Sequence, residues 1–187
     1  MNKLIAVVGM AGSGKSIATD YLKEQGWEKI YFGGAIYERM REENIEITPA
    51  SQKEYREKIR EKYGMGAVAE ILKDKIKKAY LHKNTVLDGL YSWDEYLILK
   101  EEFGETLKLI CVCCDKNIRY ERIKNRKDRP FNHEEILIRD TSEIENLAKG
   151  GPIAFADYYI FNNGNLEEYK SRLKEIITEI EKEEGEI

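Results

Sequence analysis

The 187-residue chain lacks any apolar run long enough to cross a membrane, because charged residues interrupt everything longer than a strand. The apolar run near the N-terminus stops at a glycine-rich loop without a small-residue cleavage pattern, which argues against a secretory signal. Neither sign of charge dominates, since 31 lysines and arginines stand against 35 aspartates and glutamates, for a net charge of -4. We therefore expect neither a membrane nor a nucleic-acid partner.

Cysteine and histidine are also scarce. The three cysteines lie in one strand-like run, LKLICVCC, in which Cys111 and Cys113 would share a face and Cys114 would point the other way. With no histidine nearby, small buried hydrophobic residues in a reducing cytoplasm are favoured over a metal or redox site. His82 precedes a strand and His133 begins a helix, positions typical of surface or capping residues.

The most informative stretch is residues 1–25, where an apolar run, Leu4 to Val8, breaks into a glycine-rich turn and then into a helical pattern. The turn fits G-x-x-x-x-G-K-[ST], the P-loop or Walker A motif, in the strand-loop-helix context that the motif requires. A plain glycine turn between a strand and a helix would need neither the lysine nor the hydroxyl that follows it. The predicted nucleotide-binding residues are Gly9, Ala11, Gly12, Ser13, Gly14, Lys15 and Ser16.

The residue types suit a polyphosphate. The glycines leave room for inward-pointing backbone N–H groups, and the helix N-terminus adds the positive end of its dipole. Lys15 would reach the β- and γ-phosphates, and the hydroxyl of Ser16 would bind Mg²⁺. The expected ligands are therefore ATP and Mg²⁺.

Strand and helix patterns alternate along the rest of the chain, which fits one domain over residues 1–187 with a parallel sheet covered on both faces. Gly33 and Gly34 are expected to form a turn after the second strand, and Gly150 and Gly151 a loop junction. The charged helical pattern from Ser51 to Leu81 exceeds what a crossover needs, so it predicts a small subdomain for a second substrate. After Leu4–Val8, strands are expected at 29–32, 84–87, 106–114 and 157–161; helices are expected at 35–46, 51–81 (divided by Gly64 and Gly66), 92–104, 116–126, 133–147 and 166–183.

Ligands of such a sheet collect at the carboxyl ends of its strands, where Asp88 follows an apolar strand as a Walker B aspartate does. Asp88 is thus a candidate catalytic residue and Mg²⁺ ligand, with a simple turn or helix cap as the alternative. Gly89 follows it, where many ATP-hydrolysing machines place a glutamate. Tyr91 and Ser92 could contact an acceptor or serve only as turn residues.

Basic residues gather in DKNIRYERIKNRKDRP, just after the fourth strand. Arg119, Arg122 and Arg126 are spaced three and four apart, so they share one helix face. Such runs are usually solvated, but arginine contacts to a phosphoryl group in transfer can be worth ~10³ or more in rate. Catalytic roles are therefore assigned to Arg122 and Arg126, with Arg139 on the next helix as a further candidate.

Several segments together resemble a known family. The strand-loop-helix start, the helical insert and the R-x-x-x-R spacing of Arg122 and Arg126 resemble the nucleoside monophosphate kinase group of P-loop kinases. The ending ADYYIFNNGNLEEYKSRL looks like that of dephospho-coenzyme A kinases. REKYGMGAVAE and VLDGLYSWDEY, with Arg139-Asp140, are similar to adenylate-kinase-related proteins often labelled dephospho-coenzyme A kinase-like.

The resemblance implies a three-layer α/β/α P-loop fold with a five-stranded parallel sheet of order 2-3-1-4-5. It also implies a helical acceptor-binding insert at about 35–82 and a short lid at about 127–135. By the same resemblance, Arg122 and Arg126 become lid arginines, and Asn162 to Gly164 become an adenine contact.

The acceptor side departs from the family pattern. Adenylate kinases carry G-D-x-x-R after strand two, and here those positions read Gly33, Gly34 and Tyr37. Arg39, half a turn away, could substitute for the missing arginine. Arg60, spaced i, i+4 from Arg56, becomes a candidate for the acceptor phosphate, although both could merely pair with nearby glutamates. The predicted substrate-binding residues are Gly34, Arg39, Arg60, Tyr91 and Arg139.

The favoured function is an ATP-dependent small-molecule kinase acting on a nucleotide-like acceptor, either a nucleoside monophosphate or dephospho-coenzyme A. The alternative is a regulatory NTPase or switch without an acceptor. A GTPase would show N-K-x-D and D-x-x-G, but Asn125 to Asp128 has arginine in second place, and Asp88 is followed by Gly89, Leu90 and Tyr91. A third possibility is an ATP-binding interaction module that has lost transfer activity.

Overall fold

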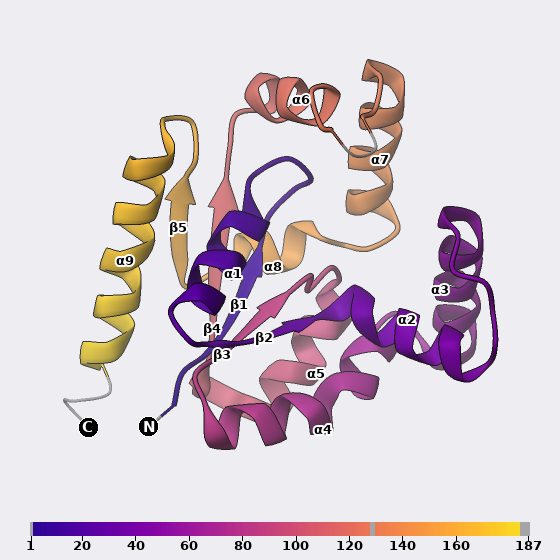
Figure 1. Ribbon diagram of the computed structural model, residues 1–187, viewed down its shortest axis with the longest axis horizontal. Helices are drawn as coiled ribbons and strands as arrows, with labels where there is room; N and C mark the ends of the chain where they lie inside the picture. The colour runs from indigo at the N-terminus through magenta and orange to yellow at the C-terminus, as the bar shows by residue number, and fades with distance from the viewer. Residues whose placement is uncertain (1, 128–129, 184–187) are drawn as a thin grey trace.

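The computed structural model describes residues 2–127 and 130–183. Within these ranges five parallel strands form one sheet of order β2-β3-β1-β4-β5 (Figure 1). The predicted topology is therefore confirmed. The strands are β1 (Leu4–Val8), β2 (Glu28–Tyr31), β3 (Thr85–Asp88), β4 (Leu107–Cys113) and β5 (Tyr158–Phe161).

Helices cover both faces of this sheet, as the alternating pattern predicts. One face carries α1 (Lys15–Glu24) and α9 (Leu166–Glu183), and the other carries α2 (Phe32–Glu42), α4 (Ala67–His82) and α5 (Trp93–Phe103). Beyond the carboxyl ends of β4 and β5 lie α6 (Lys116–Lys124) and α7 (His133–Glu145) (Figure 1). The remaining elements are α3 (Pro49–Tyr63), the 3₁₀ turn η1 (Gly104–Thr106) and the short α8 (Gly150–Ala154).

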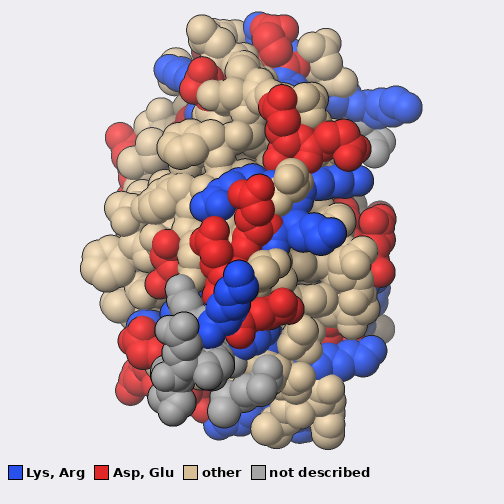
Figure 2. All heavy atoms as spheres, turned by 90° about the vertical axis from the view of Figure 1, so that its left-hand side faces the viewer, with Lys and Arg blue, Asp and Glu red and all other residues tan. Residues whose placement is uncertain are grey.

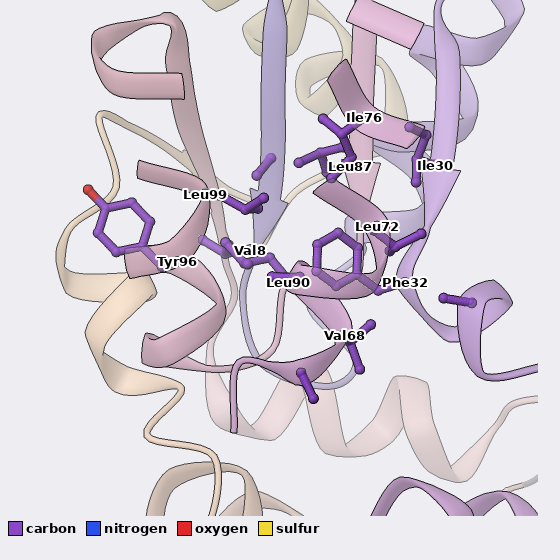
Figure 3. Packing of buried hydrophobic residues seen from close by; sticks show 14 of the residues in the cluster. Val8, Ile30, Phe32, Val68, Leu72, Ile76, Leu87, Leu90, Tyr96 and Leu99 are labelled. Atoms are coloured by element: carbon purple, nitrogen blue, oxygen red, sulfur yellow. The ribbon is translucent and has the colours of Figure 1, made fainter. Parts of the chain in front are cut away.

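The central strand β1 is apolar throughout because both of its faces are buried. Leu4, Ala6 and Val8 of β1 pack with α2, α4 and α5, whereas Ile5 and Val7 point to α1 and α9. Figure 3 shows the hydrophobic cluster on the side of α2, α4 and α5, in which the side chains of these helices converge on those of the strands. Its labelled members include Phe32, Leu72, Ile76, Leu87 and Leu99.

The register of the central strands gathers their carboxyl ends. Val7 of β1 lies beside Asp88, and Val8 lies beside Cys111 of β4. The loop that follows Val8 therefore starts next to the residues that end β3 and β4, which is where ligands of parallel sheets bind.

The predicted helical insert divides into parts with different surroundings. Ala69, Leu72 and Ile76 of α4 are buried against the sheet, so this helix acts as the crossover between β2 and β3. By contrast, α3 stands away from the sheet (Figure 1). It begins with a capping box in which the Thr48 hydroxyl accepts the Ser51 N–H and the Ser51 hydroxyl accepts the Thr48 N–H.

Two expected glycine turns are helical instead, and these predictions were wrong. Gly33 and Gly34 lie in the first turn of α2, which starts directly after Tyr31. A Cβ on Gly33 would fall 2.5 Å from the Tyr31 ring, so glycine is needed here for close packing. Gly150 and Gly151 belong to α8, where a Cβ on Gly151 would fall 2.5 Å from the Trp93 ring.

The outer surface fits the balanced composition. Acidic and basic side chains are interspersed over the face on which α9 lies (Figure 2). Among the residues that the structure describes, no helix is both long and apolar enough to span a bilayer.

Candidate active site

The loop between β1 and α1 is held by side chains from distant parts of the chain. Arg119 Nη1 donates to the Ala11 carbonyl at 2.8 Å, Asn162 Nδ2 to the Ser13 carbonyl at 2.7 Å, and Tyr169 Oη to the Gly14 carbonyl at 3.1 Å. Lys15 Nζ donates to the carbonyls of Gly9 and Met10, at 2.8 and 3.0 Å. Because a peptide N–H points opposite to its C=O, drawing these carbonyls outward directs N–H groups into the loop.

The loop needs glycines both for their backbone conformation and because neighbouring atoms leave no room for a Cβ. Gly9, Gly12 and Gly14 have φ values of +140°, +81° and +103°, in the region that side chains disfavour. A Cβ on Gly12 would lie 2.9 Å from the Arg119 carbonyl oxygen, and one on Gly14 would collide with the Asn162 amide. These observations fit a preformed cradle for a polyphosphate at the N-terminus of α1.

The buried side chain of Lys15 is influenced by several charged residues. Burial, followed by the like charge of Lys149, lowers the pKa of Lys15 to about 7, while Glu143 and Asp88 oppose the shift. An anion bound beside Lys15 would favour the charged form of its side chain.

Ser16 and Asp88, the predicted Mg²⁺ ligands, are linked through Thr19. The Thr19 hydroxyl lies 3.2 Å from both the Ser16 carbonyl oxygen and Asp88 Oδ2. Lys29 Nζ also lies 2.8 Å from Asp88 Oδ2 and 2.7 Å from Asp20 Oδ1. These contacts of Asp88 fall on Oδ2, and a hydroxyl with a carboxylate is a donor set that suits Mg²⁺.

The three arginines of the basic helix have different surroundings. Arg119 is buried and forms a two-pronged ion pair with Asp140, at 3.2 and 2.6 Å. Arg122 Nη1 donates to Cys114 Sγ at 3.3 Å, and Nη2 donates to Asn162 Oδ1 at 3.4 Å. The helix ends at Lys124, two residues earlier than predicted, so Arg126 lies beyond its C-cap.

The end of β4 lies behind the cradle. The Sγ atoms of Cys111 and Cys113 are 3.5 Å apart, which confirms that they share a face, and all three cysteines are free. Together with Cys114 they line a cavity of about 110 Å³ against Gly9 and Ser13 of the loop.

Asn162 and Gly164 were expected to contact adenine. The structure places the Asn162 side chain under the P-loop, where it is buried and bonded to the loop backbone. Gly164 is exposed in the turn before α9. The turn as a whole lies beside Gly14 and Arg122, at one end of the cradle.

Residues of α3 and α5 lie beside the loop that follows β3. Glu95 Oε2 accepts the N–H groups of Tyr91 and Ser92, at 2.7 and 3.2 Å, while its buried Oε1 has no hydrogen-bond partner in the described structure. Burial raises the pKa of Glu95 to about 7, and the positive charge of nearby Arg60 opposes the shift. Arg60 Nε is likewise buried without a partner among the described residues. Burial and then the like charge of Arg56, against the attraction of Glu95, lower the pKa of Arg60.

Residues of α2 lie on two different sides. Tyr37 Oη donates to Gln52 Oε1 at 3.2 Å, and its ring centroid is 6.3 Å from that of Tyr31. Two residues along, Arg39 points in nearly the opposite direction, toward Tyr55 and Glu43, as helix geometry requires. Gly34 is half-buried near the Tyr31 ring.

Sequence reasoning missed a buried ion pair beside Lys15. Lys149 Nζ lies 2.7 Å from Glu143 Oε2 and 5.0 Å from the centroid of the Tyr91 ring. Glu143 Oε1 accepts the Arg139 Nε–H at 3.2 Å, which places the predicted residue Arg139 in the same cluster. Lys149 stands before two glycines and reads as a loop residue, so no local pattern could have indicated it.

The comparisons with known proteins agree with this geometry. A family model described as an AAA domain matches residues 5–146. The UPF0200 protein of Sulfurisphaera tokodaii is 34% identical over 182 residues, which cover 95% of this chain and 97% of that protein.

Solved structures share the fold at low sequence identity. Shikimate kinase from Bacteroides thetaiotaomicron matches with a TM-score of 0.62 and 13% identity, covering 96% of this chain and 98% of that one. A gluconokinase from Sinorhizobium meliloti matches with a TM-score of 0.54 and 16% identity, covering 97% of both chains. The fold and the cradle thus define a P-loop protein whose fold is shared with these small-molecule kinases. The chain carries an AAA domain and belongs to the UPF0200 proteins.

Proposed function

We propose that this protein is an ATP-dependent small-molecule kinase that transfers the γ-phosphoryl group to a nucleotide-like acceptor. A nucleoside monophosphate and dephospho-coenzyme A are the two candidates. The observation that carries the proposal is a pair of buried groups, one on α3 and one on α5, beside the loop that follows β3. Arg60 and Glu95 each keep a buried polar atom without a partner in the described structure, next to Tyr91. Unpaired buried groups are costly, so they point to a polar ligand that completes them.

The donor side rests on the cradle. The N–H groups of the loop bind the phosphates, and Lys15 exchanges the carbonyls of Gly9 and Met10 for phosphate oxygens. Mg²⁺, when bound, would neutralise phosphate charge, with Ser16 and Asp88 as the residues that hold it. Arg122 and the turn at 162–164 then lie toward the base of the nucleotide.

The transfer step needs positioning and positive charge more than covalent chemistry. Burial and then the like charge of Arg139, opposed by the attraction of Glu143, lower the pKa of Arg126. We assign Arg126 and Arg139 to the oxygens of the moving phosphoryl group. Closure of the lid, predicted at about 127–135, would exclude water; residues 128–129 of it lie outside the described residues.

The alternative is a regulatory NTPase or switch that has no acceptor. The altered pattern after β2 favours it, because Tyr37 occupies the arginine position and bonds to Gln52 instead. Against it, Gly89 follows Asp88, and a Cβ at position 89 would lie 2.9 Å from the Tyr91 ring. A glutamate next to Asp88 is thus absent from the sequence and has no room in this loop.

ADP release with ATP and Mg²⁺ distinguishes the two functions. Turnover is measured with a panel of nucleoside monophosphates, with dephospho-coenzyme A and with water alone, and Lys15→Ala is the inactive control. The kinase proposal expects one acceptor to raise the rate well above water, and expects Lys15→Ala to remain folded without turnover. Equal rates in water and with every acceptor would refute it in favour of the NTPase.

A further inference from the structure

Lys149 is one of the most completely buried side chains in the described structure, at 1% exposure. It stands at the N-cap of α8 and reaches between α7 and the loop after β3. Its ammonium group contacts the Glu143 carboxylate and the face of the Tyr91 ring. None of the motifs that define the P-loop includes this residue.

A purely structural role explains this arrangement poorly. Removing two charges from water costs several kcal/mol per ion, and a well-packed apolar pair often stabilises a fold as well or better. Here the pair includes the N-cap residue of α8, a helix whose Ile153 lines a cavity together with Gly9 and Met10 of the P-loop. After burial itself, Lys149 has the largest influence on the pKa of Lys15.

Positive charge gathers around Glu143, whose two oxygens bind Arg139 and Lys149. Lys15 also acts on this carboxylate, while Asp88 and Asp140 are the further carboxylates that act on Lys15 and on Lys149. Although burial acts to raise it, the pKa of Glu143 is lowered overall by Lys149 and then by Arg139 and Lys15. A carboxylate that bridges two cations in this way resembles one edge of a phosphate group.

We propose that Lys149 is a second phosphate-binding lysine, and that Glu143 holds it and Arg139 in place until the terminal phosphate of a nucleoside triphosphate takes over these contacts. This rests on the nucleotide site of the proposed function but not on the identity of its acceptor. Lys149 lies over Tyr91, toward Arg60 and Glu95. Arg122 and Asn162 mark the opposite, base-binding end.

The position of Lys149 has a specific consequence for binding. Because the proposed contact is to the terminal phosphate of a triphosphate, a diphosphate, which lacks that phosphate, would not make it. Lys149 therefore sets the preference for triphosphate over diphosphate, while the loop N–H groups bind the inner phosphates of both.

The test measures binding of AMP-PNP and of ADP, each with Mg²⁺, to the full chain by calorimetry. The variants are Lys149→Met, the double variant Lys149→Met/Glu143→Gln, and Lys83→Met as a control at an exposed lysine. In both Lys149 variants we expect AMP-PNP affinity to fall about 10- to 100-fold, the size of a lost charge-assisted hydrogen bond. ADP affinity should stay within about twofold, and the control should match wild type.

Thermal melting of the same proteins separates binding from structure. Lys149→Met leaves Glu143 without this partner and should melt earlier, while the double variant should recover most of the loss. If the double variant also recovers AMP-PNP affinity, Lys149 is structural and the proposal is wrong. Parallel losses for AMP-PNP and ADP, unchanged AMP-PNP affinity, or a wild type that binds no triphosphate would also overturn it. The kinase proposal fails separately, if the expected binding pattern is seen but no acceptor raises ADP release.

Discussion

Replacing Arg119 with methionine tests whether a buried ion pair holds the P-loop in shape. Arg119 donates to the Ala11 carbonyl and pairs with Asp140 on α7, and the two side chains are only 8% and 10% exposed. One guanidinium therefore joins the cradle, the basic helix and the helix that follows. Its loss should affect both stability and nucleotide binding.

The size of the effect follows from burial. Methionine fills much of the space but leaves the Asp140 carboxylate without its cation and the Ala11 carbonyl without its donor. Removing one partner of a buried pair costs about 3–5 kcal/mol. For a domain of this size each kcal/mol lowers Tm by about 2–4 °C, so Arg119→Met should melt about 6–20 °C below wild type.

Urea denaturation of a double-mutant cycle measures this coupling. Arg119→Met, Asp140→Leu and the double variant are compared with Arg172→Met, whose partners Glu175 and Glu179 lie on the surface of α9. The control should lose no more than about 1 kcal/mol. The double variant should regain most of the stability but not the affinity for ATP, because the Ala11 carbonyl still lacks its donor.

Two results would refute the reasoning. One is a loss from Arg119→Met as small as that of the control, which would mean that the pair is effectively solvated. The other is a coupling energy near zero in the cycle, which would mean that Arg119 and Asp140 act independently.

Two further predictions concern the acceptor side and the lid. Burial raises the pKa of Glu95 from 4.5 to about 7, so between these pH values the native state keeps a proton that the unfolded chain releases. The stability that protonated Glu95 contributes is therefore complete below pH 4.5 and is lost as the pH rises through 7. In urea denaturation, Glu95→Gln should therefore match wild type near pH 4.5 and be the more stable protein at pH 8, by at most about 3 kcal/mol. If wild type were instead the more stable protein at pH 8, Arg60 would be stabilising the charged form of Glu95. Arg126→Ala should lower kcat roughly tenfold or more while leaving ATP affinity near that of wild type, with the exposed Lys124→Ala as control. A raised Kd for ATP with unchanged kcat would instead make Arg126 a ground-state contact.

Much of the fold follows from local patterns in the chain. Apolar runs of strand length that alternate with helical patterns predict a parallel sheet, because both faces of each strand must be buried. The glycines of the P-loop predict positive φ angles, and Gly9, Gly12 and Gly14 have them. The strand order came from the family resemblance, and the sheet confirms it.

Predictions from local patterns were wrong at the two glycine pairs, where side-chain packing led to helices in place of turns. Gly33 and Gly34 read as a turn, but the Tyr31 ring occupies the space where a side chain at Gly33 would lie, and α2 begins at once. In the same way, α8 forms where Gly151 lets the Trp93 ring approach the backbone.

The partners of each charged side chain depended on tertiary structure. Arg119, Arg122 and Arg126 share a spacing, yet one is buried against Asp140, one bonds to Cys114 and Asn162, and one lies past the helix end. The side chains that bind the carbonyls of Ala11, Ser13 and Gly14 come from residues 108 to 155 positions away along the chain.

The sequence by itself determined the phosphate cradle, because backbone conformation and glycine spacing act within a few residues. Only the tertiary structure decided what surrounds the cradle, including the buried pair of Lys149 and Glu143. The physical reason is that burial and pairing of charges depend on which distant segments the packed sheet brings together, and no local pattern records that.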